Sequence, residues 1–170
     1  MRYRTFGTSG LRISELILGA MTFGEQGGVG APIAECRQML DLYAEALGAH
    51  ESSRVTLPDG RTLTVELLLG DTTLAIAGEM PDRGQRTPAA LGGTSAALHV
   101  EVSDIDSAWA RALQAGATVV EPVHDAFWGD RTGQFLDPSG HRWAFDQHLQ
   151  DVPPAEVAAR AAELFGSATP

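Results

Sequence analysis

The chain has 170 residues, of which 44% are hydrophobic, and it carries a formal net charge of −10. This length and composition fit one domain with an ordinary apolar core. The acidic balance excludes nucleic acid and anionic membranes as expected partners, because both require a basic face. The lone Cys36 leaves no internal disulfide. There is no apolar run of the roughly 20 residues that span a membrane, and no signal-peptide core, so we expect a cytoplasmic protein.

The first 47 residues predict a short hairpin, a strand and a helix. The hairpin joins Arg4-Thr5-Phe6 to Leu11-Arg12-Ile13, the strand follows over 15–22, and a helix runs from about residue 32 to Gly48. The runs MRYRTFGTSGLRISELILGAMTFGEQ and AECRQMLDLYAEA resemble the N-terminus of aldo-keto reductases. That family's catalytic segments do not follow, so we expect no reductase site. The Gly-rich loop 24–30 is a connector or a lid.

Three alternating segments follow. SRVTL and TLTVELLL flank the turn Pro58-Asp59-Gly60 and predict a hairpin, and TTLAIAG predicts a third strand. Residues 79–93 are rich in Gly, Pro and charge without a period, which predicts a linker.

The region 94–148 repeats this arrangement of elements. TSAALHVEV alternates as a strand, Asp104 caps an amphipathic helix that ends at Gly116, and TVVEPV is a short strand. GQFLD and HRWAFDQ form a strand pair about the turn Asp137-Pro138-Ser139-Gly140. A final helix is predicted over 153–165.

The runs LGGTSAALHVEVSDIDSAWARALQAGATVVEPV and WGDRTGQFLDPSGHRW resemble the PhnB-like branch of the glyoxalase/bleomycin-resistance (vicinal-oxygen-chelate) superfamily, and the resemblance extends over about residues 47–166. It implies an α+β fold of two βαβββ modules whose curved sheets enclose a small-molecule cavity, usually in a homodimer. We therefore expect one domain over 1–170, with modules at about 14–78 and 94–148. The reductase-like segment would supply the first strand and helix, which makes the chain a chimera.

The resemblance also locates a possible metal site. Metal-dependent members bind their ion through His and Glu side chains on the first and last strands of each module. Alignment by the turn motifs puts Ala75, Ala97 and Ala144 at three of these four positions, and only Glu15 offers a donor near the fourth. A methyl group cannot bind a metal, so we expect no metal and no cofactor.

Alternation predicts which polar side chains share the cavity face. With Ala97 and Ala144 inward, His99, Glu101, Arg142 and Asp146 face the same way, and Glu66 joins them from the first module. We expect Arg142 to pair with Asp146 or Glu101, because an unpaired buried charge is costly. Trp128 is a candidate stacking surface or dimer contact, and Arg131 or Arg142 a candidate anion clamp. The set is either a structural polar network or a ligand site.

Two functions remain open. The first is a metal-free protein that sequesters or senses a small organic ligand or antibiotic. The second is a lyase or isomerase that uses His99 as general base, either without a metal or with an atypical ligand set.

Overall fold

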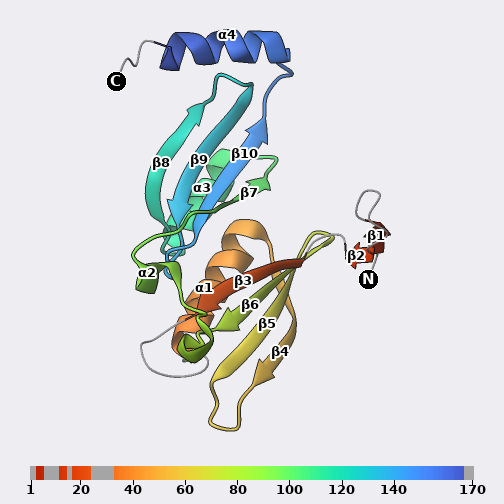
Figure 1. Ribbon diagram of the computed structural model, residues 1–170, viewed down its shortest axis with the longest axis vertical. Coiled ribbons are helices and arrows are strands. Elements are labelled where there is room, and N and C mark those ends of the chain that lie inside the picture. The colour runs from red at the N-terminus through yellow and green to blue at the C-terminus, as the bar shows by residue number, and fades with distance from the viewer. Residues whose placement is uncertain (1–2, 6–11, 15–16, 24–32, 167–170) are drawn as a thin grey trace.

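The computed structural model describes residues 3–5, 12–14, 17–23 and 33–166, and the side chains of residues 37–166. Its main body consists of two similar units, each with one helix and a four-stranded sheet (Figure 1). The predicted α+β class with two curved sheets is confirmed, and the sheets do not close into a barrel.

The first module contains β3 (Ile17–Phe23), α1 (Ile33–Leu47), β4 (His50–Thr56), β5 (Thr62–Leu69) and β6 (Thr72–Gly78), with strand order β3-β6-β5-β4. β3 pairs with β6 in parallel, so residues 17–47 supply the first strand and helix as expected. Residues 15 and 16 of the predicted 15–22 strand lie outside the described residues, and β3 is described over Ile17–Phe23. β4 forms one edge of this sheet and is exposed along its whole length.

The second module contains β7 (Ala97–Glu101), α3 (Ile105–Gln114), β8 (Thr118–Asp125), β9 (Asp130–Leu136) and β10 (Arg142–His148). Its strand order, β7-β10-β9-β8, repeats that of the first module, with the parallel pair again at one edge. The side chain of Asp104 caps α3 by accepting the Ser107 amide at 3.1 Å, as predicted. β9 starts at Asp130, three residues before the predicted strand, and β10 extends one residue further, to His148.

The remaining elements lie outside the two sheets. β1 (Tyr3–Thr5) and β2 (Arg12–Ser14) form the expected antiparallel hairpin. The segment predicted as the linker between the modules contains two short helices, η1 (Pro81–Arg83) and α2 (Pro88–Leu91). Both begin at a proline, whose fixed φ suits a first helical turn, and the Thr87 hydroxyl caps α2. α4 (Pro154–Phe165) lies across the end of the second sheet (Figure 1).

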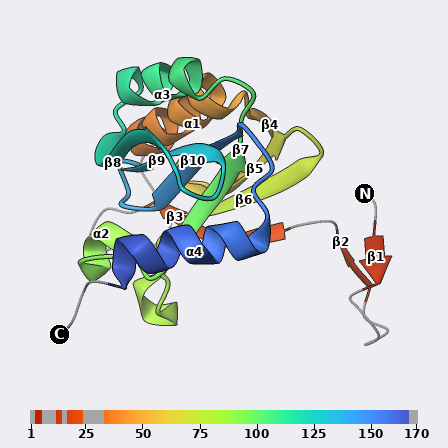
Figure 2. The same cartoon turned by 90° about the horizontal axis from the view of Figure 1, so that it is seen from above.

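The core lies between the sheets and the two long helices. Figure 2 shows α1 and α3 together on one side of the sheets, with α4 on the other side. The residues that face these helices are buried and include Val65, Leu67, Leu74, Ile76, Phe135 and Phe145. The opposite face of each sheet is therefore open, apart from the end of the second sheet where α4 lies (Figures 1 and 2).

One buried carboxylate joins the modules. Asp137, in the turn between β9 and β10, accepts the hydroxyl of Tyr43 on α1 at 2.7 Å and the indole N–H of Trp143 at 3.1 Å. Its other oxygen accepts the amides of Ser139 and His141 at 2.9 and 3.0 Å. All four hydrogen bonds end on a side chain that is only 4% exposed.

Candidate functional site

The open face of the second sheet carries a hollow of about 340 Å³. Side chains alternate across a strand, so β7 contributes its odd positions and β9 and β10 their even positions to this face. Five residues line the hollow, and all are titratable: His99, Glu101, Asp130, Asp146 and His148.

Each imidazole in the hollow is held by a carboxylate. Nδ1 of His99 lies 2.7 Å from Oδ2 of Asp146, whose Oδ1 accepts the Thr132 hydroxyl at 2.6 Å. Nδ1 of His148 lies 2.9 Å from Oδ1 of Asp130, directly across the strand pair. The hydrogen bond at Nδ1 therefore orients each imidazole ring. The side chain of His99 is 60% exposed and that of His148 is 53% exposed.

The electrostatic surroundings of the two histidines differ. The hydrogen bond with Asp130 raises the pKa of His148, and the carboxylate of Asp151, 3.2 Å from Nε2, adds to this effect. Among the described residues, His99 pairs with one carboxylate, that of Asp146.

An aromatic side chain borders the hollow. Trp128 donates its indole N–H to Oδ2 of Asp130 at 3.0 Å and is 40% exposed. Its ring packs edge-on against Phe127, which in turn contacts Phe165 at the end of α4. Because Asp130 holds both Trp128 and His148, a flat apolar surface lies next to the polar hollow.

The predicted set is brought together only in part. His99, Glu101 and Asp146 line the hollow, with Trp128 beside it. Glu66 lies on the sheet of the other module, where it accepts the Ser53 hydroxyl at 3.0 Å, and it does not line this hollow. The sheets lie one beyond the other rather than face to face within the chain, and this separates Glu66 from the other candidates (Figure 1).

The two arginines are placed differently from the prediction. Arg142 lies on the open face, but its Nε donates to Gln134 Oε1 at 2.7 Å. The expected pairing with Asp146 or Glu101 was wrong, because Arg142 lies opposite Ala97 at one end of β10, whereas Asp146 lies opposite Glu101 four residues further along the strand. Arg131 points to the helix side and binds Asp106 and Asp125, each at 3.0 Å, so it does not reach the hollow.

Two residues of the hollow were not predicted. Asp130 falls in what looked like a loop, although β9 already begins there. His148 lies two residues after Asp146 and so shares its face, but the predicted strand stopped at Gln147. Extending the alternation by one position would have found His148.

The described positions at which the resemblance places metal ligands do not fit an ion, and the fourth position, near Glu15, lies outside the described residues. Ala75, Ala97 and Ala144 all end in methyl groups, and Ala144 is fully buried. Across the described ranges, no group of three or more His, Cys, Asp or Glu side chains has the arrangement of a metal site. The nearest donors, His99 and Asp146, are hydrogen-bonded to one another.

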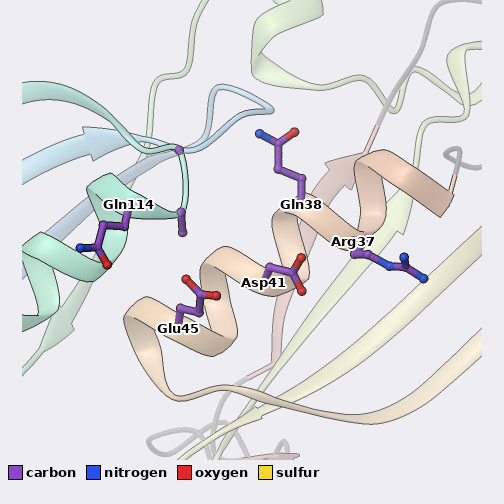
Figure 3. A pocket seen from close by; sticks show the side chains of 7 residues that line it. Arg37, Gln38, Asp41, Glu45 and Gln114 are labelled. Atoms are coloured by element: carbon purple, nitrogen blue, oxygen red, sulfur yellow. The ribbon is translucent and has the colours of Figure 1, made fainter.

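A second depression, of about 440 Å³, lies on the helix side between α1 and the end of α3. Its polar side chains, among them Arg37, Asp41, Glu45 and Gln114, point in different directions instead of converging (Figure 3). A binding site needs a few convergent polar groups, so the hollow on the open face is the stronger candidate. No helix among the described residues is long and apolar enough to cross a membrane.

Known proteins are similar to this chain in sequence and in architecture. An uncharacterised protein of Mycobacterium bovis is 36% identical over 130 residues, covering 75% of this chain and 86% of its own, and an uncharacterised Mycobacterium tuberculosis protein is equally similar, with 76% of its length covered.

Among solved structures, a glyoxalase/bleomycin resistance protein/dioxygenase from Nocardioides has a TM-score of 0.56 at 21% identity, with 86% of this chain and 91% of that chain covered. TioX from Micromonospora sp. ML1 has a TM-score of 0.53 at 20% identity, with coverages of 80% and 99%. TnmS3, an antibiotic binding protein from Streptomyces sp. CB03234, has a TM-score of 0.50 at 19% identity, with coverages of 80% and 97%.

A family model covers most of the chain. It matches residues 28–145, which include the helix of the first module, β7, β9 and the first part of β10, and it ends just before Asp146 and His148. The chain therefore belongs to the Glyoxalase/Bleomycin resistance protein/Dioxygenase superfamily.

Proposed function

We propose that this protein binds a small organic ligand in the hollow on the open face of its second sheet. The observation that carries the proposal is the convergence of five polar side chains, four of them held by hydrogen bonds, next to the exposed ring of Trp128. Polar groups that fix orientation beside an apolar surface are the usual features of a ligand site. The ligand class we favour is an aromatic organic molecule, such as an antibiotic, that is sequestered or sensed.

Two observations support binding without the superfamily's usual metal. The alanines at 75, 97 and 144 offer no donor atoms. The superfamily also contains binding proteins, since the similar fold of TnmS3 belongs to an antibiotic binding protein. We extend only the general class of ligand from TnmS3 to this chain.

The setting of this function is also proposed. We infer a homodimer in the cytoplasm, built from a PhnB-like chain whose N-terminal segment came from an aldo-keto reductase. The exposed faces of both sheets support a dimer, because a partner's sheet could cover a ligand that one open sheet leaves exposed to water.

Thermal-shift screening against aromatic antibiotics, followed by calorimetry with bleomycin and each compound that shifts the melting temperature, tests the proposal. A ligand at 100 times its dissociation constant should stabilise the folded state by about 2.7 kcal/mol. Trp128→Ala and Glu101→Gln should weaken binding, whereas His50→Gln, on the exposed edge strand β4, should not. Equal binding by all three variants would place the ligand elsewhere.

One observation favours a second candidate function, a metal-independent lyase or isomerase that uses His99. The Asp146 carboxylate holds Nδ1 of His99 at 2.7 Å, as a partner that orients a general base would.

A further inference from the structure

Arg142 is a cation on the open face of the second sheet that no carboxylate neutralises. In the part of the chain that the structure describes, its only side-chain partner is the neutral amide of Gln134, which accepts from Nε at 2.7 Å. The two terminal nitrogens of the guanidinium have no partner there, and neither is a buried atom. Both nitrogens are therefore available to a ligand.

A second hydrogen bond fixes the direction of this guanidinium. The amide nitrogen of Gln134 donates to Oε2 of Glu121 at 2.8 Å, so its amide oxygen is turned toward Arg142. An amide at position 134 orients the arginine and leaves its charge unbalanced. A glutamate there would give the same direction but would neutralise the charge.

The contact with Gln134 brings the guanidinium toward the hollow. Gln134 lies opposite Ala144, which is two residues along β10 from Arg142 in the direction of Asp146. The small side chain of Ala144 leaves room for the arginine to bend this way. Arg142 and Asp146 are about 13 Å apart along an extended strand, so one small molecule can contact both ends of this stretch.

The hollow at the other end has the opposite charge. Its lining contains three carboxylates, two histidines and no Lys or Arg. Even with both histidines protonated, the three carboxylates leave the hollow negative. Among the described side chains, none forms a hydrogen bond or ion pair with Glu101, so this carboxylate is free to pair with a ligand.

We propose that Arg142 is the anion subsite of the ligand site, and that the ligand is a dipolar organic molecule with a carboxylate on Arg142 and an ammonium group in the hollow. The inference rests on the proposed ligand site and names the class of its ligand. Two free nitrogens of one planar guanidinium match the two oxygens of a carboxylate. A phosphate dianion fits less well, because one guanidinium carries a single charge and Glu121 and the hollow repel the second.

NMR titration with three related probes tests the two ends separately. The probe 4-(aminomethyl)benzoate carries both charged groups, benzylamine carries only the ammonium, and 4-methylbenzoate carries only the carboxylate. We expect 4-(aminomethyl)benzoate to bind about 10-fold more tightly than either of the others and to shift the signals of both Arg142 Nε–H and the His99 ring. Tighter binding of phenyl phosphate than of 4-methylbenzoate at Arg142 would overturn the choice of a carboxylate.

Three variants locate the carboxylate. Arg142→Gln should weaken binding of 4-(aminomethyl)benzoate by about 10-fold or more and leave benzylamine binding unchanged. Gln134→Glu should have a similar effect, because the new carboxylate neutralises Arg142. Arg61→Gln, which removes a positive charge from the exposed turn before β5, is the matched control and should bind all three probes like the wild type.

The outcomes separate this inference from the binding proposal. If benzylamine shifts the signals of the hollow but Arg142→Gln binds 4-(aminomethyl)benzoate as tightly as the wild type, with an unchanged circular dichroism spectrum, the anion subsite is overturned and the ligand site stands. If 4-methylbenzoate shifts Arg142 but neither ammonium probe shifts the hollow, the dipolar class of ligand is overturned. Absence of binding by all three probes overturns the inference, whereas failure of every screened antibiotic to bind counts against the hollow as a ligand site.

Discussion

Replacing Asp137 with alanine should destabilise the protein more than any other single change at the junction of the modules. The carboxylate accepts four hydrogen bonds at 2.7 to 3.1 Å, and two of the donors are the side chains of Tyr43 and Trp143, which are 0% and 2% exposed. A buried donor deprived of a charged acceptor costs about 1–3 kcal/mol. With two buried side-chain donors affected and two amides in a turn, we expect a loss of about 3–5 kcal/mol in the free energy of unfolding.

Urea denaturation followed by circular dichroism measures this loss. Tyr43→Phe removes one of the four hydrogen bonds and should cost about 1–2 kcal/mol. In the double variant the two effects should not add, because both substitutions remove the same contact between α1 and the β9–β10 turn. Asp71→Ala, in the exposed turn between β5 and β6, is the control and should leave stability within about 0.5 kcal/mol. A loss below about 1 kcal/mol for Asp137→Ala would refute the idea that this carboxylate joins the modules.

Three further predictions concern titration, backbone and surface charge. Burial and the neighbouring Asp137 raise the pKa of Tyr43 well above its usual value, so the folded state binds this proton more tightly than the unfolded state. Stability should therefore be lost as pH rises beyond the unfolded tyrosine value of about 10, and denaturation of Tyr43→Phe should lack this component. In an NMR titration, Asp130→Asn should lower the pKa of His148, and an unchanged value would show that Asp130 is not its main partner. Gly129 has a φ of +107°, and a Cβ there would meet the Gln150 carbonyl, so Gly129→Ala should lower the melting temperature by several degrees, whereas Gly60→Ala, which meets no atom, should lower it less.

Local pattern was enough to predict most of the fold. Period-two alternation predicted the strand that carries the buried Val65 and Leu67, and the cap at Asp104 and the left-handed Gly116 bounded α3 as predicted. The end of β8 was not predicted from alternation alone. The predicted strand TVVEPV stops at Val123, but a register shift between Glu121 and His124, around Pro122, lets β8 continue to Asp125. Elements were therefore predicted better than their ends.

The candidate site was predictable only where one strand or one strand pair determined it. His99 and Asp146 share a face by alternation, and their strands are neighbours in the repeated module. Arg142 donates to Gln134 instead of an acid, and Arg131 is held on the helix side of the sheet by Asp106 of α3. A side chain as long as that of arginine can reach several partners in the folded protein, and the spacing of residues in the sequence does not show which partner it contacts. Tyr43 and Asp137, which are 94 residues apart, illustrate the same limit.

The exposed edge strand β4 has a consequence for solubility. An edge strand offers unpaired amides and carbonyls to any extended chain, and this is a common start for aggregation. β4 carries an ion pair between Glu51 and Arg54, and the only large apolar side chain exposed along it is Val55. Charges on an edge strand oppose the addition of a further strand. Replacing Glu51 and Arg54 with valine should therefore allow β4 to nucleate fibrils, while the hollow of the other module stays intact.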